Sequence, residues 1–260
     1  MGAVSAPSPR VLVSPAMAVP SRFYAPLVDA FAAVGWTAEA VGRRGFEPDG
    51  PRAGRRSDWS YADEIDDLAD AVGRARRADP ARPVLLLGHS LGAQLAIGLQ
   101  HRRGGTAVDG LVLVGASVPH HRHDPYAGLP MLAYAAAVPV LARAVGHVPK
   151  PAFGGPGAAT LMHEWAGFVR SGRPPFEAPG LLRTPTLVVH LQGDAYAVSG
   201  ANKRFVEQFL DPDVVTRWVY TKDAVPDGGT TDHVRWAQHP TVVVDRVVGW
   251  WGARTSHPTA

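Results

Sequence analysis

Short apolar runs alternate along the chain with longer segments in which apolar residues recur every three or four positions. A continuous apolar run of four to eight residues is typical of a strand buried on both faces, and the wider spacing is typical of an amphipathic helix. Their repeated alternation predicts an α/β protein with a doubly wound, mostly parallel sheet. The predicted strands cover residues 11–13, 36–41, 84–87, 110–114, 186–190 and 214–220.

Helices are predicted between these strands, and the helix that begins after Ser60 has the clearest start signal. Asp63 stands three positions later, which completes a capping-box pattern. Acidic residues crowd the first turns of this helix and arginines crowd its last turns, as the helix dipole favours, so we interpret these charges as structural. The other predicted helices cover residues 26–34, 93–99, 202–210 and 241–251.

Residues 118–182 interrupt the alternation, because they are rich in Pro, Gly and Ala and contain two helical patterns in succession. The patterns cover 131–145, where Pro139 is expected to kink the helix, and 160–170. An insertion that leaves the carboxyl end of a sheet would lie over a site there. We therefore expect residues 1–117 and 183–260 to form one core, with 118–182 as a helical lid.

Composition limits the classes of protein that this chain can be. Its 260 residues, 46% of them hydrophobic, suffice for one domain core, and the absence of cysteine excludes disulfides and thiolate metal sites. The segment 1–10 lacks the pattern of a signal peptide, and no apolar run approaches the ~18 residues of a membrane span. We expect a soluble, cytoplasmic protein.

The net charge of +3 does not indicate a nucleic-acid partner, because the basic residues are scattered among acidic ones and form no stripe. The densest basic cluster lies in a Gly/Pro-rich loop. Either it is a solvated loop, or it docks an anionic substrate arm such as a phosphopantetheine. Its members are Arg43, Arg44, Arg52, Arg55 and Arg56.

Ser90 stands at the centre of Gly88-His89-Ser90-Leu91-Gly92, between a predicted strand and a predicted helix. This G-x-S-x-G pattern is typical of a nucleophile elbow, in which a strained serine projects its hydroxyl from a sharp strand-to-helix turn. Small flanking residues let strand and helix pass closely. The pattern predicts that Ser90 is a nucleophile, and a plain strand-turn-helix junction is the alternative.

A serine nucleophile needs a base to take its proton and an acid to orient that base, in the chain order Ser, Asp, His for this elbow. Asp194 follows a predicted strand, and His233 lies in a glycine-rich loop after the last strand. We predict that these two complete a catalytic triad. His239 is the rival base, and Asp227 and Asp232 remain rival acids.

An oxyanion hole also requires backbone donors. We predict the N–H of Leu91 as one donor and that of Ala16, in the loop after the first strand, as the other, with Met17 as the alternative to Ala16. The candidate substrate-binding residues are Met17, His89, His120 and Trp165.

Three histidines, His120, His121 and His123, stand at the start of the insertion. Their spacing would suit a metal, but Asp124 is the only neighbouring carboxylate. We interpret them as loop or substrate-contact residues, and predict neither a metal nor a cofactor.

The chain resembles the α/β-hydrolase family over nearly its whole length. The residues that carry this resemblance are the elbow around Ser90, Gly193-Asp194 and His233. More narrowly, residues 15–20 with Phe23-Tyr24, and His163-Glu164-Trp165, resemble a bacterial branch of predicted hydrolases and serine-peptidase-like esterases. The resemblance implies a lid-covered acyl pocket and no cofactor.

The chain departs from that family in two places. Ser14-Pro15 stands where the family usually has His-Gly before its first oxyanion loop, which affects the expected shape of this loop. Only about ten residues precede Val11, so we expect the sheet to lack the family's N-terminal edge hairpin.

The expected activity is hydrolysis of a carboxylic ester, lactone or thioester with an apolar acyl part, through an acyl-enzyme. The expected partner is a small molecule, with a carrier-bound thioester as an alternative, and no nucleic acid. The same residues would serve an acyltransferase or cyclase of secondary metabolism, and a non-catalytic ligand-binding pseudohydrolase is a third class. Peptidase activity remains open, but no specificity feature supports it.

Overall fold

The computed structural model describes residues 8–123, 128–149 and 155–255. Its centre is a six-stranded sheet in the order β2-β1-β3-β4-β7-β8, and every recorded pairing within it is parallel. The predicted α/β class with a parallel, doubly wound sheet is confirmed. The strands are β1 (Arg10–Ser14), β2 (Thr37–Ala40), β3 (Val84–His89), β4 (Gly110–Val114), β7 (Thr186–Leu191) and β8 (Val215–Tyr220).

The strand order places a crevice beside β1. From β1 the chain passes to β2 on one side, and then returns to β3 on the other side. Ligands of open α/β sheets bind outside the carboxyl ends of the strands at such a switch point. The register pairs Ser14 with Gly88 and His89 with Val114, so β1, β3 and β4 end at the same edge.

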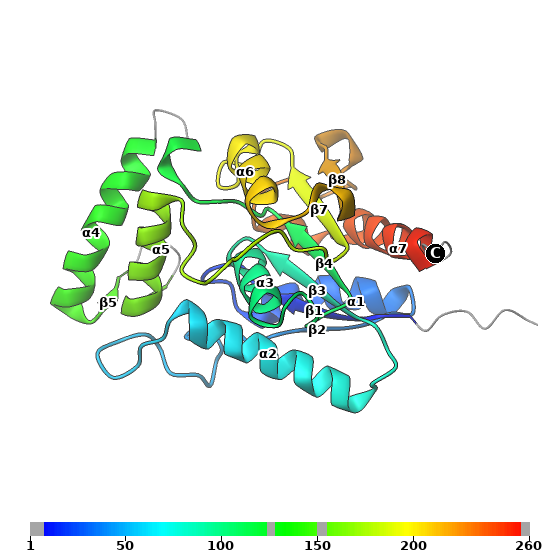
Figure 1. The fold of residues 1–260 in the computed structure, drawn as a ribbon, viewed down its shortest axis with the longest axis horizontal. Helices are drawn as coiled ribbons and strands as arrows, with labels where there is room; N and C mark the ends of the chain where they lie inside the picture. The colour runs from blue at the N-terminus through cyan, green and yellow to red at the C-terminus, as the bar shows by residue number, and fades with distance from the viewer. Residues whose placement is uncertain (1–7, 124–127, 150–154, 256–260) are drawn as a thin grey trace, which may run out of the picture.

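Helices cover both faces of the sheet (Figure 1). Successive residues of β3 point to opposite layers, since Leu86 belongs to one buried cluster while Leu85 and Leu87 belong to the other. One face carries α1 (Ala25–Ala33) and α7 (Thr241–Thr255), and the other carries α2 (Tyr61–Ala78), α3 (Leu91–Arg102) and α6 (Ser199–Phe209). Short 3-10 helices are η1 (Ser21–Tyr24), η2 (His121–His123), η4 (Pro212–Val214), η5 (Lys222–Ala224) and η6 (Arg235–Gln238).

The predicted capping box at the start of α2 is present. The Ser60 side chain accepts a hydrogen bond from the N–H of Asp63 (3.2 Å), and the Asp63 carboxylate accepts one from the N–H of Ser60 (2.8 Å). In the described part of the chain, β1 is the first element.

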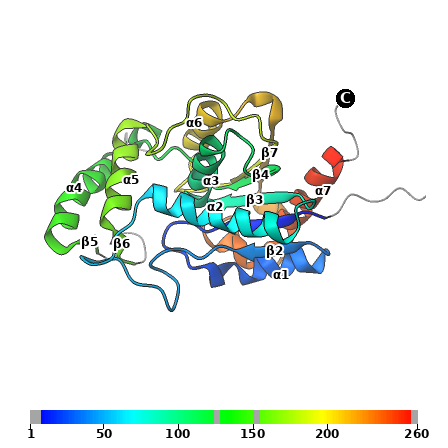
Figure 2. The same ribbon diagram turned by 60° about the horizontal axis from the view of Figure 1, so that its bottom comes forward.

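Between β4 and β7 the chain forms α4 (Leu129–Val145), which contains Pro139, and α5 (Ala159–Ser171). Both views place these helices side by side at one end of the molecule (Figures 1 and 2). A short hairpin that the sequence did not predict, β5 (His147–Val148) with β6 (Gly157–Ala158), joins them. Within residues 8–123, 128–149 and 155–255, no helix has the length and apolar character to cross a membrane.

The insertion is fastened to the loop that precedes α2. Backbone N–H of Leu161 donates to the carbonyl of Trp59 (2.9 Å), and the Thr160 hydroxyl donates to the carboxylate of Asp58 (2.6 Å). The N–H of Tyr61 donates to the carboxylate of Glu164 (2.7 Å). Residues 58–61 therefore hold the start of α5 against the core.

Candidate active site

Ser90 occupies the strained turn that its motif predicts. Its φ of 53° lies in the left-handed region, which is unfavourable for a residue with a Cβ. A Cβ on Gly88 would lie 2.6 Å from Cα of Ala93, and one on Gly92 would lie 2.0 Å from the carbonyl oxygen of Ser14. Both positions therefore require glycine, because α3 crosses β3 and the loop after β1 without room for a side chain.

Three side chains from distant parts of the chain meet at this turn. Nε2 of His233 lies 2.9 Å from Oγ of Ser90, and Nδ1 of His233 lies 2.7 Å from Oδ2 of Asp194. Asp194 follows β7 and His233 follows β8, so the parallel sheet delivers both to the edge where β3 ends. Gly115, with φ of +57°, gives His233 space: a Cβ there would lie 3.1 Å from its Cε1.

Asp194 is buried but well supplied with hydrogen-bond donors. Its Oδ1 accepts from the backbone N–H groups of Tyr196 (2.8 Å) and Ala197 (2.9 Å), while Oδ2 faces His233. Burial by itself raises the pKa of Asp194, but the hydrogen bond and charge of His233 and the two N–H groups outweigh it, so the net pKa is lowered. The carboxylate is thus ionised at neutral pH and can stabilise a positive charge on the imidazole.

The rival residues occupy other positions. The carboxylate of Asp232 is exposed and accepts from two backbone N–H groups just beyond His233, at 2.9 and 3.1 Å, as a turn-capping aspartate does. Asp227 and His239 are exposed. Of the carboxylates weighed from the sequence, Asp194 is the one bonded to His233.

One of the two predicted backbone donors near Ser90 is engaged inside the protein. The N–H of Ala16 donates to the hydroxyl of Tyr24 (2.9 Å), so it is not available for a ligand and the expectation for Ala16 is wrong. Within the described residues, the N–H groups of Met17 and Leu91 have no intramolecular acceptor. Met17 therefore replaces Ala16 as the candidate donor, in a tight turn where Ala18 has a φ of 61°.

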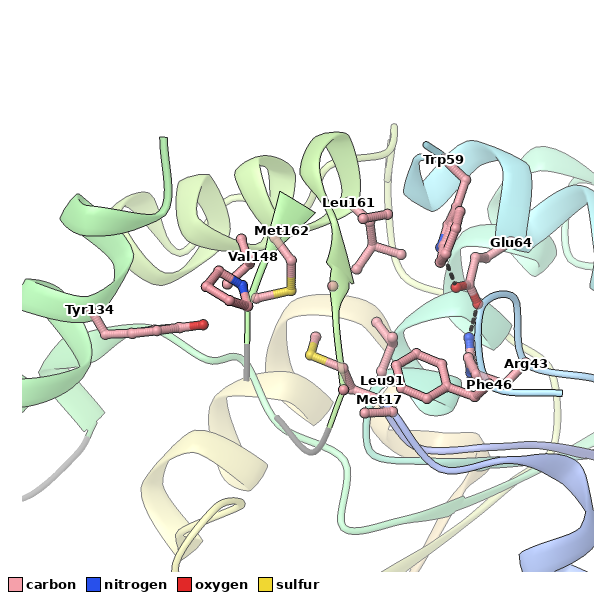
Figure 3. Close-up of a pocket in the computed structure, with 15 residues that line it drawn as sticks. Met17, Arg43, Phe46, Trp59, Glu64, Leu91, Tyr134, Val148, Leu161 and Met162 are labelled. Carbon is pink, nitrogen blue, oxygen red and sulfur yellow. Dashed lines mark hydrogen bonds and ion pairs between the residues drawn. The ribbon is translucent and has the colours of Figure 1, made fainter. Parts of the chain in front are cut away.

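A cavity lies between the turn at Met17, Leu91 and the insertion (Figure 3). Its volume is about 20 Å³, which is enough to hold a water molecule. The wall is apolar except for an ion pair between Arg43 and Glu64. The larger apolar and aromatic side chains of the wall include Met17, Phe46, Trp59, Leu91, Tyr134, Val148, Leu161 and Met162.

Three predicted substrate contacts are absent from this wall, and only Met17 belongs to it. His89 has no exposed surface, and both of its ring nitrogens face groups of the protein. Trp165 is buried in the core against Tyr134, with ring centroids 6.0 Å apart. The ring of His120 lies against His121, with centroids 4.7 Å apart.

No group of three or more potential metal ligands exists among the described residues. Asp124, the carboxylate considered beside the three histidines, lies outside those residues. His121 instead approaches the backbone, since its Nδ1 lies 3.1 Å from the carbonyl oxygen of Val169.

The five clustered arginines differ in exposure, since Arg43 is buried whereas Arg52, Arg55 and Arg56 are exposed. Arg43 is buried and pairs with Glu64, and its guanidinium also donates to the carbonyl of Pro15. Three other members bind within the protein. Arg44 pairs with Asp67 (2.5 Å), Arg52 donates to the carbonyl of Gly45 (2.9 Å), and Arg55 donates to that of Ala144.

A parallel, doubly wound sheet with a G-x-S-x-G turn at the end of its third strand is the architecture of an α/β-hydrolase. The family described as "Serine aminopeptidase, S33" matches residues 5–152, and the chain belongs to this family of hydrolases. A comparison with curated proteins finds no match.

Solved structures of other hydrolases have a similar fold. A soluble variant of monoglyceride lipase from Saccharomyces cerevisiae has a TM-score of 0.65 at 14% identity, covering 96% of this chain and 88% of that one. A bromoperoxidase from Bacillus anthracis has a TM-score of 0.63 at 17% identity, covering 94% of this chain and 92% of that one. A thermophilic esterase from Thermogutta terrifontis has a TM-score of 0.63 at 16% identity, covering 94% of this chain and 89% of that one. At these identities the likeness concerns the fold alone.

Proposed function

We propose that the protein is a serine hydrolase that cleaves a carboxylic ester, lactone or thioester with an apolar acyl part, in two steps through an acyl-enzyme. The observation that carries the proposal is the continuous hydrogen-bonded line from the carboxylate of Asp194 through His233 to the hydroxyl of Ser90. A hydroxyl in this arrangement can lose its proton to the imidazole as it attacks a carbonyl carbon.

In the first step Nε2 of His233 takes the proton of Ser90 while Oγ bonds to the carbonyl carbon of the substrate. The negative charge that develops on the carbonyl oxygen would be stabilised by the N–H groups of Leu91 and Met17, each worth about 3 kcal/mol in such a site. Asp194 stabilises the imidazolium. The imidazolium then gives its proton to the leaving alcohol or thiol, and water releases the acid by the reverse sequence.

The wall of the cavity supports an apolar acyl group, because most of its side chains are aliphatic or aromatic. Side chains of α4 and α5 line this cavity, so we propose that these helices act as a lid that shifts when substrate enters. Four of the five clustered arginines bind groups of the protein itself, which favours a free small ester or thioester over one on a carrier.

The test is covalent labelling with a fluorophosphonate probe, which reacts with activated serines. We expect one label on the peptide that contains Ser90, and none in Ser90→Ala. Ser199→Ala is the matched control, because the hydroxyl of Ser199 also lies within hydrogen-bond distance of a histidine, 3.1 Å from Nε2 of His190, but at the start of α6. Absence of labelling at Ser90 in the folded protein would refute the proposal and favour a binding protein.

The substrate class is tested with p-nitrophenyl esters of graded acyl length, matching acyl-thioesters, and aminoacyl p-nitroanilides. We expect kcat/KM to be highest for an ester or thioester with an apolar acyl group. Turnover of the anilides alone would indicate a peptidase. Acyl transfer to an added alcohol in preference to water would indicate an acyltransferase.

A further inference from the structure

Two buried side chains, Tyr24 and His89, connect the three segments that form the candidate site. The N–H of Ala16 donates to Oη of Tyr24 (2.9 Å), and that oxygen lies 2.7 Å from Nδ1 of His89. Nε2 of His89 lies 2.7 Å from the backbone carbonyl oxygen of His233. The loop after β1, the residue before Ser90 and the loop of His233 are thus joined in one line.

The chemistry of the end groups fixes the direction of every hydrogen bond in this line. Nε2 of His89 lies 2.7 Å from the carbonyl of His233, which can only accept, and 3.3 Å from the indole nitrogen of Trp236, which can only donate. The shorter contact assigns the proton to Nε2, so Nδ1 accepts from the Tyr24 hydroxyl. Oη of Tyr24 then accepts from the N–H of Ala16 on a lone pair. The indole of Trp236 packs edge-on against the His89 ring, with ring centroids 5.4 Å apart.

Neither side chain of the line titrates near neutral pH. His89 and Tyr24 have no exposed surface. Burial, and secondly the neighbouring His233, lowers the pKa of His89 to about 3, and burial raises the pKa of the Tyr24 hydroxyl. Both remain neutral, so the line keeps one pattern of hydrogen bonds while His233 gains and loses protons.

The line has a direct effect on the backbone of the turn after β1. Pro15 and Ala16 share a peptide group, whose carbonyl accepts from Arg43 and whose N–H donates to Tyr24. The next peptide group combines the carbonyl of Ala16, which accepts from the N–H of Val19 (3.2 Å), with the N–H of Met17. Holding these two groups leaves the N–H of Met17 as a preoriented donor.

We propose that Tyr24 and His89 are positioning residues: they set the Met17 N–H and the backbone of His233 relative to Ser90 without touching the substrate. This inference rests on the proposed function, because it concerns the geometry of the same reaction. A residue with this role affects the transition state more than the bound substrate, so its loss lowers kcat and leaves KM nearly unchanged.

The experiment compares Tyr24→Phe with Tyr61→Phe. Tyr61 is a matched control because it also has no exposed surface and its hydroxyl makes one hydrogen bond inside the protein, to Gln94 (2.8 Å), between α2 and α3. For each variant we would measure kcat and KM on the best p-nitrophenyl ester, the rate of fluorophosphonate labelling, and Tm. Tyr24→Phe is expected to lower kcat and the labelling rate by about 10- to 100-fold, below the ~10²–10³ of losing an oxyanion donor outright.

Tyr61→Phe is expected to lower Tm to a similar extent but to keep kcat within about threefold. Equal effects of the two variants on kcat would show that Tyr24 is merely structural, and would overturn the inference. If Tyr24→Phe does not fold, His89→Gln, which keeps a donor and an acceptor, replaces it, and an unchanged kcat there overturns the inference. Failure of the proposed function is a separate result, since the wild-type protein would then show neither turnover nor labelling.

Discussion

Nε2 of His233 lies 2.9 Å from Oγ of Ser90 although 143 residues separate them in the chain. The parallel sheet produces this proximity, because β3 and β8 end at the same edge and each is followed by one of the two residues. The glycines that surround the pair, Gly88, Gly92 and Gly115, lie where a Cβ would meet backbone or His233. The closeness of the two side chains therefore depends on backbone packing as well as on their own hydrogen bond.

Asp194→Asn is expected to reduce kcat by about 10⁴-fold with little change in Tm. An amide can offer its N–H to Nδ1 of His233, which would stabilise the wrong tautomer and leave the imidazolium without a counter-charge. Ester turnover by purified protein is the measurement. Asp232→Asn, in the exposed carboxylate next to His233, should keep kcat within a few-fold, and an equal loss in that variant would reopen the identity of the acid.

Gly92→Ala is expected to destabilise the protein by at least ~2 kcal/mol, because the added Cβ would lie 2.0 Å from the carbonyl oxygen of Ser14. Gly167→Ala is the control, since that position in α5 has no atom within 4 Å of an added Cβ. There alanine should stabilise the protein by ~0.5–1 kcal/mol. Urea unfolding measures both values, and a neutral Gly92→Ala would contradict the close approach.

For the buried ion pair of Arg43 and Glu64, we expect the stability losses in a double-mutant cycle to be strongly non-additive. Both side chains are almost fully buried, at 3% and 5% exposure, and Trp59 donates to the same carboxylate at 3.1 Å. Either Arg43→Met or Glu64→Leu leaves an uncompensated buried charge and should cost ~3–5 kcal/mol. The double variant should cost clearly less than the sum in urea unfolding, and simple additivity would indicate that the two charges do not stabilise each other.

Because His89 is buried, we expect the protein to lose stability in mild acid. Its pKa is lowered from 6.5 to about 3, chiefly by burial, so as pH falls the unfolded chain binds a proton that the folded protein refuses. The contribution of neutral His89 to the free energy of unfolding is fully present above pH 6.5. It declines from there to about pH 3, by at most ~1.4 kcal/mol per pH unit. Urea unfolding between pH 7.5 and 4.5 measures the slope.

The matched protein for this measurement is His89→Gln, which lacks the titrating ring and should have a shallower dependence on pH over the same interval. His233, Asp194 and Arg43 contribute the charges that act on this ring, and they are unchanged in the variant. An identical slope in both proteins would mean that other groups cause the acid sensitivity.

Local signals in the sequence were sufficient for most elements. The capping box at Ser60 and Asp63 marks the first turn of α2, and the apolar run before Ser90 marks β3, because each signal lies within one element. The hairpin of β5 and β6 was missed, since two strands of two residues carry no periodic pattern. Sequence order and the rule that parallel strands end together were enough to select Asp194 and His233 as candidates.

For other site residues, nothing in the sequence indicated the role that the structure gives them. Tyr24 and Glu64 occupy ordinary helical positions, and their roles come from partners far along the chain. His89 was predicted to contact the substrate, but it ends a strand that is buried along its whole length. The amide of Ala16 was expected to face the substrate, and only the approach of η1 to the loop after β1 turns it toward Tyr24.

The amino-acid sequence by itself determined the alternation of strands and helices, the strained serine turn and the chemical types that could accompany it, because these depend on spacing and on backbone preferences of nearby residues. Tertiary structure alone decided which backbone N–H stays free, which charges are buried as a pair and which side chains line the cavity. Those outcomes depend on hydrogen bonds and contacts between segments that the sheet brings together, and nothing in local periodicity encodes the partner at the other end.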